Sequence, residues 1–66
     1  MVKTHNIRVI ISWNKLSIGE SFFVPSLDIG ELRREIAAEA RLVGYEVIIK
    51  PVAYKGLMGV RTWRIR

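Results

Sequence analysis

The densest group of side chains able to do chemistry is the C-terminal run Arg61–Arg66 (RTWRIR), which contains three arginines around one tryptophan. An aromatic ring flanked by arginines can stack on a nucleobase while the guanidinium groups hold phosphates. Trp63 can also anchor a hydrophobic core and leave the arginines in solvent, and we favour the core position for this ring. The arginines remain candidates for phosphate contacts in both cases.

Catalytic and metal-binding patterns are absent from the sequence. There is no cysteine, and His5, the one histidine, stands in a polar stretch where we expect a solvent-exposed side chain. Glu31, Glu35 and Glu39 recur at helical spacing, but arginines interleave them, which is typical of a solvated helix face. The glycines lack the spacing of a phosphate-binding loop. We therefore expect no catalytic residue, no metal, no cofactor and no enzymatic activity.

The length of 66 residues allows one small domain, and such a domain buries only about 60% of the surface of its unfolded chain. Small cores are usually supported by disulfides, a metal or oligomerisation. Because cysteine is absent, we expect a homodimer or higher oligomer in a reducing compartment such as the cytoplasm. No apolar run exceeds four residues, whereas a membrane span needs about 20, so we expect no membrane partner.

The elements that must position these groups follow from the apolar patterning. We expect residues 1–5 to be a loose terminus and Ile7–Trp13 to be a strand with alternating apolar residues. Ser21–Val24 is expected to form a second strand that stops at Pro25. Asp28 as N-cap and Gly44 as terminator bound a stripe of apolar residues at helical spacing, which predicts a helix over Ile29–Val43.

Two more strands are expected after the helix, over Tyr45–Val52 and Val60–Ile65, with a glycine-punctuated loop at residues 53–59 between them. The order strand–strand–helix–strand–strand (ββαββ) indicates an α+β fold. In this fold one helix packs on a small, mainly antiparallel sheet.

The net charge of +5 is unevenly distributed. Residues 45–66 carry five cations and one carboxylate, whereas the helical segment 28–44 carries four carboxylates and three cations. We expect the following residues to pack under the helix: Ile7, Val9, Ile11, Trp13, Tyr45, Val47, Ile49, Trp63 and Ile65. The far face of the sheet would then carry a basic set with two embedded isoleucines: Arg8, Ile10, Ser12, Ile48, Lys50, Thr62, Arg64 and Arg66.

This pattern predicts a surface for phosphate-bearing ligands; a charge that only keeps the domain soluble and a surface for an acidic protein partner are the alternatives. The expected phosphate contacts are Arg8, Lys50, Lys55, Arg61, Arg64 and Arg66. Adjacent Phe22 and Phe23 must point to opposite faces of their strand, so one is core and the other serves a subunit interface, ligand stacking or edge packing. The expected interface residues are Ile10, Phe23, Ile48, Tyr54, Leu57 and Met58.

Two segments carry a resemblance to a known family. Ile18–Pro25 (IGESFFVP) and Gly59–Ile65 (GVRTWRI) resemble a family of small proteins encoded by tailed bacteriophages, which combine a GDSFFVP-like segment, a helix and a closing GVRVWR-like strand. The resemblance spans about Leu16 to Ile65 and implies a phage origin without assigning chemistry. The chain departs from the family at Arg41–Glu46, which is less basic than the corresponding stretch.

Our leading hypothesis is a small phage accessory protein, in the host bacterial cytoplasm, that binds nucleic acid such as DNA through the basic sheet face. Two alternatives stay open. One is a protein that inhibits a host enzyme or defence complex by direct contact during host takeover. The other is a sponge for a nucleotide signal, which would need a basic pocket between subunits.

Overall fold

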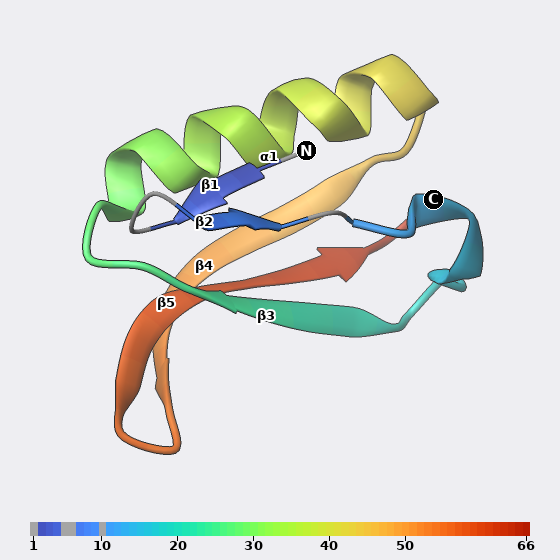
Figure 1. Cartoon of the computed structure of the whole chain (residues 1–66). Helices are drawn as coiled ribbons and strands as arrows, with labels where there is room; N and C mark the ends of the chain where they lie inside the picture. The colour runs from blue at the N-terminus through green and yellow to red at the C-terminus, as the bar shows by residue number, and fades with distance from the viewer. Residues whose placement is uncertain (1, 5–6, 10) are drawn as a thin grey trace.

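The computed structural model describes residues 2–4, 7–9 and 11–66 of the chain, with side chains from residue 11 onward. The elements follow in the order β1 (Val2–Thr4), β2 (Ile7–Val9), η1 (Trp13–Lys15, a 3₁₀ turn), β3 (Ser21–Pro25), α1 (Ile29–Val43), β4 (Val47–Tyr54) and β5 (Leu57–Arg64). The predicted α+β class, with one helix on a small antiparallel sheet, is confirmed (Figure 1).

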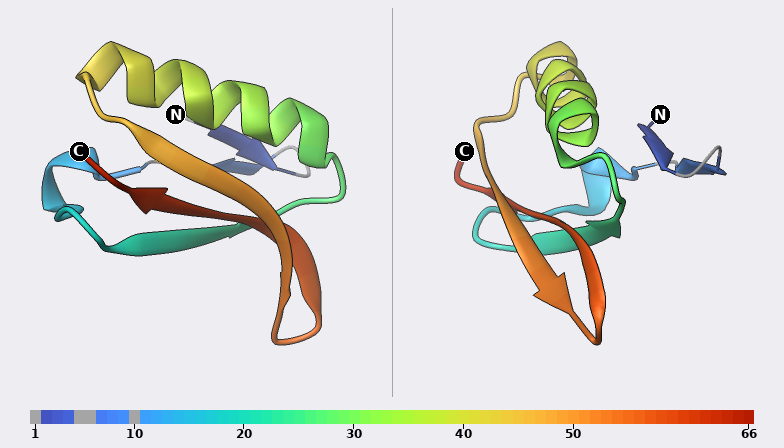
Figure 2. Two further views of the ribbon diagram at one scale, coloured as in Figure 1. Left: turned by 180° about the vertical axis from the view of Figure 1, so that it is seen from behind. Right: turned by 90° about the vertical axis from the view of Figure 1, so that its left-hand side faces the viewer.

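The sheet on which α1 packs consists of β3, β4 and β5 in the order β3-β5-β4. Both β3 and β4 are antiparallel to β5, so they run parallel to each other and need a crossover connection. α1 is this connection, and it lies over one face of the sheet (Figure 2). β1 and β2 pair as a separate antiparallel hairpin, and this hairpin lies beside α1.

α1 begins and ends where the sequence predicts, because both ends carry local capping signals. The Asp28 side chain accepts a hydrogen bond from the Glu31 backbone N–H at 3.0 Å, and the Asp28 N–H donates to the Ser26 hydroxyl at 3.0 Å. At the other end, Gly44 adopts the left-handed conformation with a φ of 80°, which glycine reaches without strain. Within the described residues, no helix combines the length and the apolar character that crossing a membrane requires.

The N-terminal segment differs from the predicted single strand Ile7–Trp13. β2 ends at Val9, and Trp13 begins the 3₁₀ turn η1. In a 3₁₀ turn, side chains three residues apart lie on the same side, so Trp13 and Leu16 both enter the core. Residues 2–4, predicted as part of a loose terminus, form β1. The predictions for His5 and Ile10 lie outside the described residues.

The β4–β5 hairpin is longer than predicted. The expected loop at residues 53–59 contracts to a turn at Lys55-Gly56. Both turn residues have positive φ, 50° and 80°, as a type I′ turn requires. Pro51 lies inside β4, and β4 accommodates it because an edge strand leaves one side of its backbone unpaired. The tip of this hairpin projects away from α1 and lies below β3 in the view of Figure 1.

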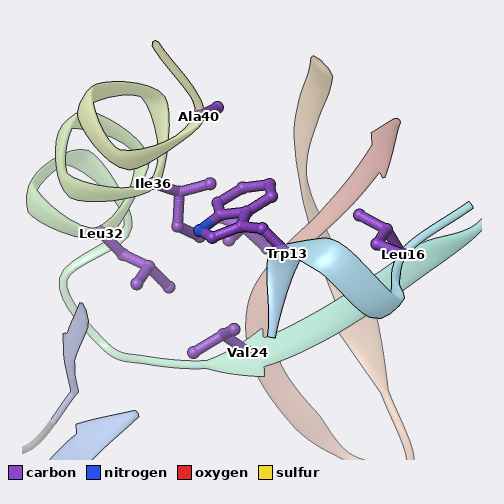
Figure 3. Close-up of a cluster of buried hydrophobic side chains, with 7 residues drawn as sticks. Trp13, Leu16, Val24, Leu32, Ile36 and Ala40 are labelled. Atoms are coloured by element: carbon purple, nitrogen blue, oxygen red, sulfur yellow. The ribbon is translucent and has the colours of Figure 1, made fainter. Parts of the chain in front are cut away.

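Trp13 occupies the space between α1 and the sheet (Figure 3). Its ring packs edge-on against Phe22 and Tyr45, with centroid separations of 5.5 and 6.0 Å. Its Nε1 donates a hydrogen bond to Glu39 Oε1 on α1 at 3.2 Å. The buried apolar side chains around it are Leu16, Val24, Leu32, Ile36, Ala40 and Val60.

The face of β5 that packs on the core is the opposite of the predicted face. Val60 and Thr62 point toward α1 and are each 0% exposed, so the intervening Arg61 and Trp63 point away from it. The prediction that Trp63 and Ile65 pack under the helix is therefore wrong, as is the placement of Thr62 and Arg64 on the far face. Trp13 already fills the space under the helix, which leaves room over β5 only for the smaller valine and threonine.

Gly59 allows β3 and β5 to approach each other closely. A Cβ atom added at this position would collide with the Val24 carbonyl oxygen and would lie 2.7 Å from the Pro25 Cα. Backbone atoms of a paired strand cannot move away cheaply, so this glycine is required for space. At Gly30, in the first turn of α1, an added Cβ would meet only ordinary contacts, the nearest at 3.7 Å.

We therefore expect the same substitution to have opposite effects at these two positions. Gly59→Ala should lower the free energy of unfolding by about 3 kcal/mol, because β3 must shift to accept the methyl group. Gly30→Ala should raise it by about 0.5 kcal/mol through the reduced entropy of the unfolded chain. Urea denaturation of both variants tests this, and equal midpoints for the two would contradict it.

Candidate nucleic-acid interface

We call the sheet face opposite α1 the open face. Cross-strand partners share a face, and successive residues of a strand alternate between faces. Because Val24, Val60 and Thr62 point toward α1, the register assigns the complementary set to the open face: Ser21, Phe23, Pro25, Ile48, Lys50, Val52, Tyr54, Leu57, Gly59, Arg61 and Trp63. No described element lies over this face in either view of Figure 2.

The three-stranded sheet contains cations but no carboxylates. β3, β4 and β5 contain no aspartate or glutamate, whereas α1 carries three glutamates and three arginines. Lys50 and Arg61 lie on the open face, and Lys55 lies in the turn at the hairpin tip. An anionic ligand approaching the open face therefore meets cations without a competing carboxylate in the strands.

Aromatic rings and a guanidinium group form one cluster on the open face. The rings of Phe23 and Tyr54 lie 5.4 Å apart between centroids. The Arg61 guanidinium carbon lies 5.2 Å from the Tyr54 centroid and 5.9 Å from the Phe23 centroid. Its Nη1 donates to the Ser21 hydroxyl at 3.0 Å, and the Lys55 Nζ lies 5.4 Å from the Tyr54 centroid. We call these residues, together with Lys50 and Trp63, the aromatic–cationic cluster.

Lys50 and Arg61 are direct cross-strand partners in the β4–β5 register. Like charges directly opposite each other in a sheet are destabilising. The strands hold no carboxylate that could relieve this repulsion. The Arg61 guanidinium is directed toward Ser21 and Tyr54, and we expect the remaining repulsion to lower the stability of the isolated protein and an anion placed between the two side chains to remove that cost.

Trp63 lies on the open face between Ser21 of β3 and Ile48 of β4. The ring is half-buried, and the neighbouring Ile48 is 43% exposed. The preferred core position for Trp63 is thus wrong, and the alternative, a ring beside cations on the sheet surface, is the arrangement observed. Phe22 packs on the core, and Phe23 is the phenylalanine that faces outward.

Three of the six predicted phosphate contacts do not join this cluster. Arg64 lies on the α1 side of β5, with its guanidinium carbon 3.7 Å from the Tyr45 centroid and its Nη1 donating to the Leu16 carbonyl at 2.7 Å. Arg66 forms an exposed ion pair with Glu46 at 3.7 Å. Arg8 belongs to β2, outside the three-stranded sheet, and its side chain lies outside the described part of the chain.

The predicted interface residues divide in a similar way. Phe23, Ile48, Tyr54 and Leu57 lie on the open face. Met58 points to the opposite side of the hairpin and is 51% exposed.

Comparisons of the chain with protein-family models, with curated proteins and with solved structures find no match.

Arg64 is expected to stabilise the fold rather than to bind a ligand. Besides its contacts with Leu16 and Tyr45, its Nε donates to the Arg66 carbonyl at 3.1 Å. Arg64→Ala should therefore lower the free energy of unfolding by about 2 kcal/mol, since charged hydrogen bonds and a cation–π contact are lost.

Arg66→Ala is the matched control. Its ion pair with Glu46 joins side chains that are 79% and 60% exposed, and exposed pairs contribute little. Urea denaturation should find the Arg66→Ala midpoint close to that of the parent protein. An Arg64→Ala midpoint equal to the control would contradict the assignment.

Proposed function

We propose that the protein binds single-stranded nucleic acid on the open face and acts as a small accessory protein of a tailed phage. The observation that carries the proposal is the like-charged pair Lys50–Arg61, placed among aromatic rings on a sheet face whose strands contain no carboxylate. An arrangement that costs stability in the free protein is expected where a ligand compensates for it.

The surface chemistry favours a single strand over a duplex. Aromatic rings on a sheet stack on unpaired bases and tolerate any sequence, because every base presents a flat face. The rings of Phe23, Tyr54 and Trp63 would stack on bases, while Lys50, Lys55 and Arg61 contact phosphates. A sheet of this kind holds about two or three nucleotides.

Reading of duplex DNA through α1 is disfavoured by charge. A recognition helix must enter the major groove between two rows of phosphates. Asp28 and three glutamates of α1 outnumber the three arginines of the helix, so the segment 28–44 has a net charge of −1. A helix without a net positive charge gains nothing from the phosphates on both sides of the groove, and α1 is better suited to support the sheet.

A second candidate function is a protein contact at the hairpin tip. Tyr54, Leu57 and Met58 are 39%, 56% and 51% exposed, on a hairpin whose tip projects away from α1 (Figure 1). Such exposed apolar side chains suit a second copy of the chain or a host protein. Because Tyr54 belongs both to this surface and to the aromatic–cationic cluster, this contact would compete with nucleic-acid binding at that ring.

Binding of a fluorescent oligothymidylate, measured by anisotropy, tests the proposed function. With three phosphate contacts, the logarithm of the binding constant should fall with a slope of about −2 against the logarithm of salt concentration. Arg61→Ala should weaken binding about 10-fold and reduce the magnitude of this slope by about 0.7. Arg33→Ala removes the same charge from an exposed position on α1 and should leave both quantities unchanged. No binding at about 50 mM salt would overturn the proposal and leave the hairpin contact as the remaining candidate.

Lys50→Glu should separate stability from binding. The variant places a carboxylate opposite Arg61, so the free energy of unfolding should rise by about 0.5 kcal/mol. The same change puts a negative charge on the proposed phosphate path, and affinity for the oligonucleotide should fall by more than about 10-fold. Lys50→Gln should give intermediate values in both measurements. A Lys50→Glu variant that is less stable than the parent protein would show that the like-charged pair is not a source of strain.

A further inference from the structure

A cavity of about 260 Å³ lies beside β3, and Phe23 of the aromatic–cationic cluster is one of the residues that line it. Its walls are mostly apolar and come from β3 and from the segment around η1: Ile11, Leu16, Phe22, Phe23 and Val24. Ser12 and Lys15 supply its polar groups. The deepest of these side chains reach the core, since Leu16 and Val24 are 9% and 2% exposed.

The cavity is continuous with the open face through one residue. β3 is an edge strand of its sheet, and the cavity is lined by residues from both of its faces, Phe22 on the α1 side and Phe23 on the open side. Phe23 is also the ring that packs against Tyr54 in the cluster. A chain that crosses the open face from β4 toward β3 therefore reaches the mouth of this cavity.

The residues that line the cavity indicate which chemical group it can bind. Phe22 and Phe23 offer aromatic contacts to a flat apolar ring. Lys15 is exposed and carries the positive charge at the cavity. None of the described residues that line the cavity carries a carboxylate, so an anion attached to the bound ring meets no acidic side chain from them. A flat ring joined to a nearby anion is the chemistry of a nucleobase and its phosphate.

We propose that this cavity takes one unstacked base of the strand bound on the open face, with Lys15 contacting the phosphate next to it. The inference rests on the proposed function and extends its site beyond the two or three nucleotides that the cluster accommodates. An apolar side chain of a protein partner would also suit the apolar walls, but it would leave Lys15 without a role. The position of the cavity at the end of the cluster further favours a nucleotide.

The proposal predicts a step in affinity with oligonucleotide length. A trimer of thymidylate fills the cluster, whereas a pentamer also supplies a base for the cavity. For the parent protein, the pentamer should bind about 10-fold more tightly than the trimer, the magnitude expected for one added stacked base. In NMR titrations, the methyl resonances of Leu16 and Val24 should change chemical shift when the pentamer is added and should not change when the trimer is added.

Ser12→Leu fills the cavity and should remove the step. Ser12 is exposed, and its side chain makes no capping hydrogen bond to η1, so the larger side chain is compatible with the fold. Ser17→Leu adds the same group to an exposed position that does not line the cavity, and it should keep the 10-fold step (about 1.4 kcal/mol). Lys15→Ala leaves the cavity open and should reduce the ratio of pentamer to trimer affinity from about 10-fold to about 5-fold. This second variant keeps the proposal testable if Ser12→Leu fails to fold.

The outcomes distinguish this inference from the function on which it rests. Equal affinities of trimer and pentamer for the parent protein overturn the cavity site and leave binding on the open face intact. A step that persists in both Ser12→Leu and Lys15→Ala also overturns it, because the extra base must then bind elsewhere. Absence of binding by either oligonucleotide at about 50 mM salt overturns both proposals.

Discussion

The position of Trp13 between α1 and the sheet determines which side chains remain outside the core. A tryptophan ring is the largest group that a core of this size can hold, and here it is tied to the helix by its hydrogen bond to Glu39. With that volume occupied, β5 can present only valine and threonine to the helix. Arg61 and Trp63 must then lie on the opposite face. The cationic and aromatic character of the open face is thus a consequence of how the core is filled.

The helix could be predicted from residues at its own ends. The arrangement of the sheet could not be predicted in the same way, because it depends on contacts between residues far apart in the sequence. Asp28 and Gly44 act within a few residues of themselves, so the bounds of α1 could be derived from the sequence alone. The choice of face for β5 could not, because Trp63 and the pair Val60 and Thr62 are both plausible core residues. That choice depends on Trp13, which lies far away in the sequence and enters the core through a 3₁₀ turn instead of a strand.

The same reasoning explains which site residues were found. Lys50, Lys55 and Arg61 follow from counting charges along the last two strands. Arg64 was misplaced because the face of β5 was inverted, and its contacts with Leu16 and Tyr45 depend on the fold of the η1 segment. Phe23 and Trp63 could be considered as ligand-stacking residues from the sequence, since each is an aromatic residue on a strand whose side chains alternate between two faces. The cavity beside β3 has no sequence signal, because its walls combine two segments that only the tertiary structure brings together.

The central strand of the sheet is also the one synthesised after its two neighbours. β3 and β4 each pair with β5 and not with each other. While the nascent chain emerges from the ribosome, β3 has no strand to pair with until residues 57–64 have been released, although α1 can already be formed. The apolar side of α1 and both edges of β3 therefore stay exposed during synthesis, a period in which unpaired strands are prone to aggregate. Once β5 is released, the β4–β5 hairpin can form through its tight turn, and β3 can then pair with the free edge of β5.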